Sequence, residues 1–350
     1  MNSIAGRKIV LIGGAGFIGH HLALALAKKG AQVEIVDSLQ VNNVLTFASS
    51  GNNLPNRNLY YRFVNERLDL LHEAAIPVHV QDARDYHGLS HLLTKIQPQV
   101  IVQLAAVAHA GTSNKDPYST FDHSLRTLEN ALDYSRGTLE HFIYFSSSMV
   151  YGHFLSEAVT EETPCEPLGI YGALKFAGEK IVIAYHQVFD LPYTIVRPSA
   201  LYGERCVSRR VGQIFIENGI QGLNISIHGN GSDRLDFTYI SDLVQGIVKI
   251  LENGNSKNQI FNLTYGRSRS ISETAEIVAG HFPQIKINYL PKDELMPDRG
   301  TLSIEKARRL LNYKPEYPLE KGLAQYIEWY KSIWQSQPGA ALEDLQKVTE

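Results

Sequence analysis

A tyrosine and a lysine four residues apart are the side chains of this 350-residue sequence that are best placed to move a proton. Tyr171 and Lys175 lie near the start of a run with helical composition, GIYGALKFAGEKIVIAYHQVF, so their i, i+4 spacing places the phenol and the ammonium on one helix face. A neighbouring positive charge favours the phenolate, which is the form that a general base requires. The spacing by itself is weak evidence, because a core tyrosine beside a solvated lysine is common in helices.

A run of three serines precedes this helix. Ser146, Ser147 and Ser148 follow the apolar segment HFIYF, which has the composition of a buried strand. Hydroxyls that emerge at the carboxyl end of such a strand face the ligand crevice of a parallel sheet. Ser147 could therefore share a hydrogen bond with a substrate hydroxyl as that hydroxyl loses its proton. For the triplet alone, serines that only cap a turn are the more common alternative.

A glycine-rich turn near the amino terminus indicates a dinucleotide site. The apolar run IVLI leads into GGAGFIG at 13–19, which fits both GxGxxG and GxxGxxG, and an Ala/Leu-rich helical run follows. A strand, a glycine turn and a helix in this order present backbone N–H groups and a positive helix end to a pyrophosphate. Asp37 closes the next strand, 18 residues beyond Gly19, where a carboxylate can accept ribose hydroxyls. A 2′-phosphate would meet this negative charge, so the pattern favours NAD over NADP.

The composition argues against several other classes of function. The sequence is 44% hydrophobic, with a net charge of −3 and a pI near 6.5, which gives no electrostatic case for nucleic acid or an anionic membrane as a partner. Two cysteines cannot form a disulfide framework, and without a secretory apolar segment this is typical of a cytoplasmic protein. The apolar run at 9–12 is far too short to cross a bilayer. The 13 histidines are scattered without ligand spacing, so no metal site is expected.

The elements that must position these residues are predicted to form one doubly wound parallel sheet. Six Val/Ile-rich runs recur between helical stretches, at 7–12, 32–37, 76–81, 99–106, 141–147 and 193–198. Such runs are typical of strands that helices cover on both faces, and their alternation with helices predicts an α/β fold. A helix is expected near 58–74, and a helix near 241–252 with a strand near 259–264 is expected to return to the sheet.

A change of composition after residue 198 predicts two domains. Residues 1–198, with the returning segment 237–265, are expected to form the domain that binds the dinucleotide. Residues 199–236 and 266–335 are expected to form a smaller α+β substrate-binding domain. Residues 336–350 are expected to be a loosely held tail.

Taken in order, these segments resemble the extended short-chain dehydrogenase/reductase family, and within it the nucleotide-sugar epimerases and dehydratases. The resemblance covers residues 7 to about 333 and rests on GGAGFIG, Asp37, QDARD, QLAA, SSSMVYG, YGALK, RPSALYG, DFTYISDL and RGTLSIEKARRLLNY. It implies a Rossmann-like fold, NAD as the cofactor, a nucleotide-diphosphate sugar as the substrate, and a homodimer. The dimer would pair helices near 118–135 and 170–188 with their symmetry mates.

The resemblance also assigns roles to individual residues. Tyr171 matches the family's catalytic base, Lys175 the lysine that orients the nicotinamide ribose and tunes that base, and Ser147 the catalytic serine or threonine. The cofactor would contact Gly13, Gly16, Phe17, Ile18, Gly19, Asp37, Asp82, Ala83, Leu104, Ala105, Ala106, Tyr171, Lys175, Pro198 and Ser199. The substrate would contact Ser147, Ser148, Arg209, Arg210, Arg234 and Arg299.

Three departures from the family pattern concern the substrate. Ala200 stands where the family often has an asparagine that contacts the sugar nucleotide, and Ser124 stands where a helical asparagine is expected. Leu235 stands where the phosphate-binding arginine usually precedes DFTY, with Arg234 one step earlier. The other three arginines named above could supply the missing charge, and an exposed surface role is the alternative for each.

The residues after Ser147 favour a 4-epimerase. The family's shared first step is hydride transfer from sugar C4 to NAD⁺ while Tyr171 takes the 4-OH proton. A 4,6-dehydratase also needs an Asp-Glu pair directly after its catalytic threonine, and a UDP-glucuronate decarboxylase keeps the glutamate, whereas this chain has Ser148 and Met149 there. A 4-epimerase needs no further acid or base, because the 4-keto intermediate turns over and takes the hydride back on its other face. Two alternatives remain: a 4-ketosugar reductase, which usually prefers NADPH and so conflicts with Asp37, and a non-catalytic NAD-binding regulator, which typically lacks the Tyr/Lys pair.

Overall fold

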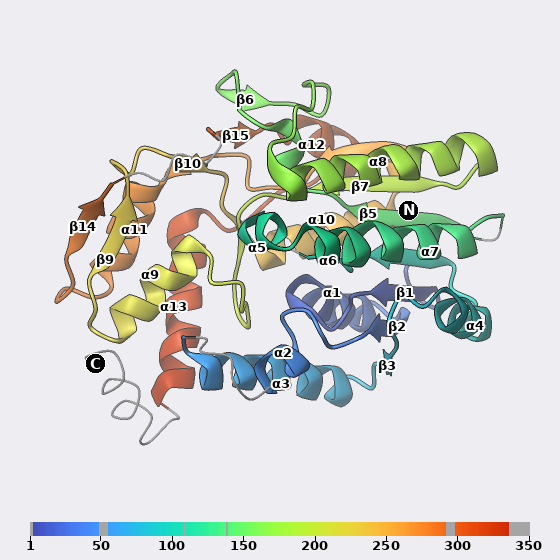
Figure 1. Cartoon of the computed structure of the whole chain (residues 1–350), viewed down its shortest axis with the longest axis horizontal. Coiled ribbons are helices and arrows are strands. Elements are labelled where there is room, and N and C mark those ends of the chain that lie inside the picture. The colour runs from blue at the N-terminus through green and yellow to red at the C-terminus, as the bar shows by residue number, and fades with distance from the viewer. Residues whose placement is uncertain (1–2, 49–54, 108–109, 138, 292–297, 336–350) are drawn as a thin grey trace.

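A seven-stranded sheet in which every strand pairing is parallel forms the centre of the molecule (Figure 1). The computed structural model describes residues 3–48, 55–107, 110–137, 139–291 and 298–335, so the predicted tail at 336–350 lies outside the described residues. From edge to edge the strands are β12 (Gln259–Asn262), β7 (Tyr193–Arg197), β5 (His141–Phe145), β4 (Val100–Gln103), β1 (Lys8–Ile12), β2 (Gln32–Asp37) and β3 (Val78–Val80). Each lies within an apolar run that the sequence predicts to be a strand, so the doubly wound sheet is confirmed.

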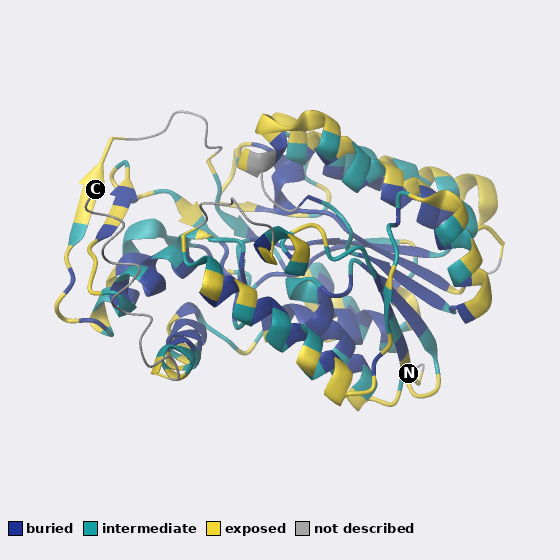
Figure 2. Ribbon diagram, turned by 60° about the horizontal axis from the view of Figure 1, so that its bottom comes forward, coloured by how far each residue is buried: buried dark blue, intermediate teal, exposed yellow. Residues whose placement is uncertain are grey.

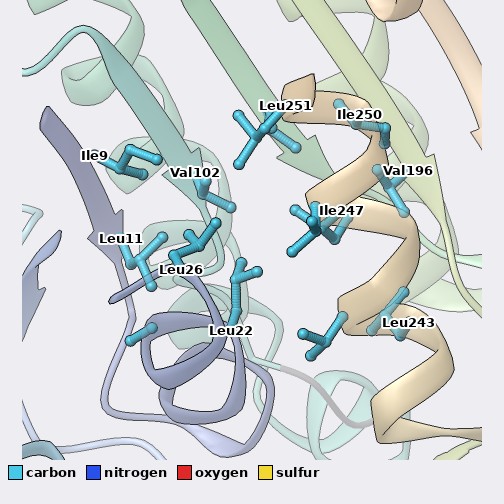
Figure 3. Close-up of a cluster of buried hydrophobic side chains, with 14 of the residues drawn as sticks. Ile9, Leu11, Leu22, Leu26, Val102, Val196, Leu243, Ile247, Ile250 and Leu251 are labelled. Atoms are coloured by element: carbon cyan, nitrogen blue, oxygen red, sulfur yellow. The ribbon is translucent and has the colours of Figure 1, made fainter. Parts of the chain in front are cut away.

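The two faces of the sheet are covered by different helices. On β1, Ile9 and Leu11 face one side, where they pack with α1 (Phe17–Lys28) and α10 (Ile240–Glu252), as Figure 3 shows. Val10 and Ile12 face the other side, where the cluster includes α4 (Tyr86–Ile96), α7 (Thr127–Tyr134) and α8 (Gly169–Phe189). Full burial of such aliphatic side chains stabilises the fold by about 1.5–3 kcal/mol each. The central strands β1, β4, β5 and β7 are therefore mostly dark blue in Figure 2, while the outer faces of the helices are exposed.

A second apolar cluster lies beside the sheet. Helix α3 (Arg57–Glu73), close to the predicted 58–74, packs there with α9 (Val211–Ile220), α11 (Ile271–Gly280) and α13 (Leu319–Gln335). The parallel pair β9 (Ile225–His228) and β14 (Ile287–Leu290) flanks these helices, at the end of the molecule away from β3 (Figure 1). Since α3 joins this cluster from the amino-terminal half, the apolar packing crosses the expected domain boundary, and the division into two domains stays a prediction.

Short elements connect these layers. The helical ones are α2 (Val44–Ala48), α5 (Ala110–Lys115), α6 (Pro117–Phe121), a π-helical turn η1 (Asp122–Arg126), the 3-10 turns η2 (Ser148–Tyr151) and η3 (Gly254–Ser256), and α12 (Glu305–Leu311). The others are three pairs of short strands: β6 (Ala158–Val159) with β15 (Thr301–Leu302), β8 (Leu201–Tyr202) with β11 (Thr238–Tyr239), and β10 (Arg234–Leu235) with β13 (Arg269–Ser270). None of the helices in the described part of the chain combines the length and the apolar character that a membrane span needs.

The helix expected near 118–135 is present as a continuous helical segment over 117–134, and it contains a π-helical turn that the sequence does not predict. Helix α6 passes into the π-helical turn η1 and then into α7. At both ends of the turn, a side chain competes for a carbonyl of the preceding turn: His123 Nδ1 lies 2.9 Å from the Ser119 carbonyl oxygen, and Thr127 Oγ1 donates to the His123 carbonyl at 2.9 Å. Such local bonds divert the regular i to i−4 pattern. The turn faces the cleft described below.

A buried carboxylate connects three helices of the second cluster. Glu217 of α9 accepts hydrogen bonds from the hydroxyls of Tyr60 on α3 and Tyr330 on α13, at 2.7 and 2.8 Å. The side-chain amides of Asn56 and Gln213 donate to it at 2.8 and 2.9 Å. Four neutral donors thus satisfy a charge that is 2% exposed.

Candidate active site

A cleft of about 170 Å³ opens where the strand order reverses, between the carboxyl ends of β1 and β4. Reversal points of this kind are where open parallel sheets bind ligands. The cleft is lined by every cofactor residue that the sequence predicts between 13 and 106, namely Gly13, Gly16, Phe17, Ile18, Gly19, Asp37, Asp82, Ala83, Leu104, Ala105 and Ala106. Pro198 and Ser199 lie at the end of β7, where the Pro198 carbonyl accepts the Ser148 N–H at 2.9 Å. The roles of all these residues stay predictions.

Two glycines allow the backbone to form this cleft. Gly13 has a φ of +81°, and a Cβ on it would lie 2.5 Å from the Ala105 nitrogen. A Cβ on Gly19 would lie 2.3 Å from the Gly14 carbonyl oxygen. Side chains at these positions would therefore force the strand ends and the start of α1 apart, and the open backbone surface that could approach a pyrophosphate would be lost.

Asp37 is fixed at the rim of the cleft by the glycine turn and by its own loop. Its Oδ2 accepts the Ala15 N–H at 3.0 Å, and its Oδ1 accepts the Leu39 N–H at 2.8 Å. Burial raises the pKa of the Asp37 carboxyl, and these two hydrogen bonds oppose the shift. The carboxylate is thus held at the end of β2, where the sequence places the ribose contact.

The loop after β3 is fixed from the opposite side of the cleft. Arg84 forms a short ion pair with Asp82, with 2.6 Å between Nη2 and Oδ2, and its side-chain hydrogen bonds lower the pKa of Asp82. The Asn130 amide on α7 donates to the Ala83 carbonyl at 2.9 Å. These contacts position the segment that is predicted to meet the adenine.

Tyr171 and Lys175 lie on one face of α8, as their spacing predicts. Lys175 is 6% exposed, its Nζ donates to the Phe145 carbonyl at 2.7 Å, and it lies 6.0 Å from the centroid of the Tyr171 ring. Burial lowers the pKa of Lys175 to about 8, and the Glu179 carboxylate opposes this shift. The ammonium is therefore fixed at the end of β5 and still charged at neutral pH, where it can stabilise a phenolate.

The serine turn packs directly against this helix. A Cβ on Gly172 would lie 2.8 Å from the Met149 carbonyl oxygen, so the glycine in YGALK allows the close approach of α8 and η2. Ser147 precedes η2, and its Oγ accepts the Met149 N–H at 3.2 Å. Ser147 thus does cap a turn, and the same placement keeps its hydroxyl beside the helix that carries Tyr171.

A buried ion pair between Arg197 and Glu179 lies next to Lys175 in the structure. Arg197 on β7 donates to both oxygens of Glu179 on α8, at 2.9 and 2.7 Å, and Ser146 Oγ donates to the same carboxylate at 2.5 Å. Arg197 also donates to the Tyr151 hydroxyl at 2.9 Å. The pair ties β5, β7, η2 and α8 together beside Lys175, with a geometry in which a buried ion pair is fully hydrogen-bonded.

A second, larger cavity of about 620 Å³ adjoins the segment that follows β7. The predicted substrate residues Arg209, Arg210, Arg234 and Arg299 all line it, and Arg210 also lines the first cleft. Arg299 reaches the Met149 sulfur, and burial lowers its pKa to about 10, with Arg210 adding to the effect. Arg234 donates to the Ser268 hydroxyl and carbonyl at 3.1 and 2.7 Å, and its Nη1 lies 3.8 Å from a carboxylate oxygen of Glu273.

The cleft also contains residues that sequence reasoning missed. Asn42, Arg67, His123 and Thr127 line it. Arg67 belongs to an ordinary amphipathic helix, and His123 and Thr127 face the cleft through the π-helical turn, so no motif marks any of them. In the described part of the chain, no three His, Cys, Asp or Glu side chains come together as a metal site requires.

Comparison with known proteins covers nearly the whole chain. The model of the NAD dependent epimerase/dehydratase family matches residues 9–264. An uncharacterised UDP-glucose epimerase of Bacillus subtilis (strain 168) is 28% identical over 338 residues, 94% of this chain and 100% of that protein. UDP-glucuronate 4-epimerase 1 of Arabidopsis thaliana is 28% identical over 358 residues, 94% of this chain and 78% of that protein.

A solved structure has the same fold. UDP-glucuronic acid 4-epimerase from Bacillus cereus, in complex with UDP-glucuronic acid and NAD, superposes with a TM-score of 0.82 at 27% identity. The alignment covers 93% of this chain and 100% of that one. The similarity therefore includes both the sheet and the region around the larger cavity.

Proposed function

The chain belongs to the NAD dependent epimerase/dehydratase family, and on that premise we propose that it is an NAD-dependent 4-epimerase of nucleotide sugars. It interconverts two sugars that differ in configuration at C4, by way of a transient 4-keto intermediate. The relatives whose names specify this reaction, from Arabidopsis thaliana and Bacillus cereus, align with the chain over more than nine-tenths of its length.

The cleft between β1 and β4 fits the cofactor of the family. Gly13 and the start of α1 line it, and a Cβ at Gly13 or Gly19 would collide with the Ala105 or Gly14 backbone that shapes it. A helix N-terminus suits the pyrophosphate, and Asp37 suits ribose hydroxyls. When bound there, NAD supplies the acceptor and then the donor of the hydride at sugar C4.

Tyr171 moves the proton of the sugar 4-hydroxyl. The Lys175 ammonium, fixed to the Phe145 carbonyl, stabilises the phenolate when Tyr171 acts as base. The Ser147 hydroxyl, at the edge of η2, can hold the sugar oxygen in line while the proton moves. Tyr171 returns the proton when the 4-keto intermediate is reduced, so the pair is restored after each turnover.

The observation that carries this proposal is the absence of an acid in the serine turn. Ser148, Met149, Val150 and Tyr151 form η2, and all four are buried against α8 without a carboxylate among them. Removal of water across C5 and C6 of a sugar, or protonation of C5 after loss of CO₂, requires a proton donor near those carbons. The thioether of Met149, contacted by Arg299, cannot provide one.

The larger cavity is proposed to hold the nucleotide-diphosphate sugar. Arg209, Arg210 and Arg299 bring positive charge to it, and a diphosphate with two negative charges complements such a group. Arg210, which lines both cavities, would stand between the cofactor and the substrate. Because Arg234 is bound to Ser268, its contribution requires that side chain to turn.

We also propose a homodimer built on α6 and α8, which contact each other. Both helices expose large apolar side chains: Tyr118 is 85% exposed and Val188 is 70% exposed, with Phe121 and Phe189 beside them in sequence. Pairing of such faces across a two-fold axis would bury them. Static light scattering at micromolar concentration tests this, and a monomer would contradict it.

A cytoplasmic setting is proposed from the two thiols. Cys165 and Cys206 are both free, and Cys206 is buried, which suits a reducing compartment. Protein alkylated under denaturing conditions at cell lysis should carry two alkyl groups by mass spectrometry, and any disulfide-linked species would oppose the proposal.

One experiment tests the proposed reaction. One sample of the purified protein is denatured to identify released NAD(H). A second, native sample is incubated with UDP-, GDP- and dTDP-sugars in D₂O, and the products are identified by NMR. We expect a C4 epimer whose carbon-bound hydrogens carry no deuterium, because the hydride leaves and returns without exchange with solvent. A 6-deoxy product with deuterium at C5 or C6, a pentose product, or consumption of NADPH would each overturn the epimerase proposal.

A further inference from the structure

Four basic side chains lie together behind the glycine turn: His20 and His21 on α1, Arg67 on α3, and Arg205 in the segment after β8. Arg205 Nε donates to His20 Nε2 at 2.9 Å, and His20 Nδ1 lies 2.9 Å from the Gly16 carbonyl oxygen. Because a guanidinium only donates, His20 must carry its proton on Nδ1 and give it to Gly16. Burial lowers the pKa of both histidines, that of His21 to about 3, so the positive charge of this cluster resides on the two arginines.

The two arginines differ in their partners. Arg205 has a carboxylate, Glu66, with 3.1 Å between Nη1 and Oε1. Arg67 donates only to carbonyls: Nε and Nη2 reach the Arg205 oxygen at 3.1 and 2.5 Å, and Nη1 reaches the Asn42 oxygen at 3.4 Å. Among the described residues, no carboxylate lies within ion-pair distance of Arg67, although its side chain is only 1% exposed. Burial lowers its pKa to about 10, so it remains charged at neutral pH.

Burying a cation without a counter-charge raises the free energy of the folded protein by several kcal/mol, and contact with a negative group offsets this. Arg67 lines the cofactor cleft between the glycine turn at Gly16–Ile18 and the loop that carries Asn42. Asp37 contributes to the electrostatics of Arg67 from beyond ion-pair distance, and its two oxygens accept the Ala15 and Leu39 N–H groups. The cleft thus provides a fixed positive charge that no carboxylate of the described residues contacts.

We propose that Arg67 is a cofactor-binding residue whose guanidinium provides the counter-charge for the dinucleotide's pyrophosphate. The Arg205–His20–Gly16 chain positions it, because the Arg205 carbonyl orients the guanidinium while the Arg205 side chain is fixed to the turn that faces the same phosphates. The inference rests on the cofactor of the proposed function and is independent of the sugar substrate and of the reaction.

The test compares ligands with and without phosphates. Dissociation constants of NAD, ADP and adenosine are measured by isothermal titration calorimetry on the full-length protein, and NAD retained through gel filtration is quantified after acid denaturation. A hydrogen bond to a charged group contributes about 1.5–3 kcal/mol, so Arg67→Met should weaken NAD and ADP by roughly 10- to 100-fold. Adenosine should change by less than about threefold, and the variant should retain less NAD.

Arg62→Met is the matched control, because Arg62 lies on the same helix and donates to the Ile333 carbonyl, away from the cleft. It should leave all three constants unchanged. Equal losses of ADP and adenosine affinity in Arg67→Met would show that Arg67 only maintains the fold, and unchanged ADP affinity would also overturn the proposal. If Arg67→Met does not fold, Arg67→Gln decides, because it removes the charge and keeps a side-chain donor for the Arg205 carbonyl: a loss of roughly tenfold or more for ADP without a loss for adenosine supports the inference, and any other pattern refutes it.

Discussion

Replacing Lys175 with methionine should reduce turnover in a way that depends on pH. The Lys175 ammonium lies 6.0 Å from the centroid of the Tyr171 ring. At an effective dielectric constant of about 20, two unit charges about 6 Å apart interact by about 2.8 kcal/mol, which corresponds to a factor of roughly 100 in rate when one of the charges develops in the transition state. Lys175→Met should therefore lower turnover roughly 100-fold at pH 7.

The difference in turnover between the unsubstituted protein and Lys175→Met should become smaller at higher pH. Because the pKa of Lys175 is about 8, the stabilising charge is present below pH 8 and is lost as the pH rises through that value. At pH 9 only about a tenth of the lysine is charged, so the advantage of the unsubstituted protein should fall to roughly 10-fold. The assay is single-turnover epimerisation at saturating NAD and substrate between pH 6.5 and 9.5.

A second lysine on the same helix provides the control. Lys180 is exposed and lies 4.9 Å from the Phe176 ring centroid, so Lys180→Met should leave the profile unchanged. A Lys175→Met to wild-type ratio that stays constant over the pH range would refute the electrostatic reasoning. Near-native turnover of Lys175→Met at pH 7 would refute the assignment of the pair itself.

Four further substitutions test the catalytic residues, the cofactor site and the fold. Tyr171→Phe should lower turnover by roughly 10²–10⁴-fold while the NAD dissociation constant stays within a few-fold, and Ser147→Ala should cost less; near-native turnover of Tyr171→Phe would contradict the mechanism. Asp37→Ala should weaken NAD and narrow the preference for NAD over NADP by at least about tenfold in calorimetric titrations, and an unchanged ratio would show that Asp37 does not face the ribose. Glu217→Gln should lower the free energy of unfolding in urea by roughly 3 kcal/mol, because about two charge-assisted hydrogen bonds are lost, and a loss under about 1 kcal/mol would mean that the carboxylate contributes little.

The strands and the glycine turn could be predicted because their causes are local. Continuous Val/Ile runs indicate burial on both faces, and the positive φ of Gly13 together with the close approach of Gly19 to Gly14 explains why glycine stands at those positions. The i, i+4 spacing likewise placed Tyr171 and Lys175 on one face of α8.

The parts that could not be predicted depend on contacts between distant segments. Nothing in the sequence around Arg67 shows that the segment after β8 covers it and turns it into a buried cation. The π-helical turn arises from competition between side chains and backbone, through His123 and Thr127, which periodicity does not register. Arg234 lies one residue before the motif position of the phosphate-binding arginine, and its guanidinium donates to the Ser268 carbonyl, a contact that the motif does not indicate.

The carboxylate of Glu217 also limits when the chain can finish folding. Tyr60 is synthesised long before Tyr330, yet both donate to this one side chain, across 157 and 113 residues of sequence. Until α13 has emerged, the apolar face that α3 turns towards it remains uncovered during synthesis. Contacts between such distant segments slow folding and expose apolar surface to other chains. A chain that ends before α13 should therefore aggregate rather than yield a folded cofactor-binding fragment.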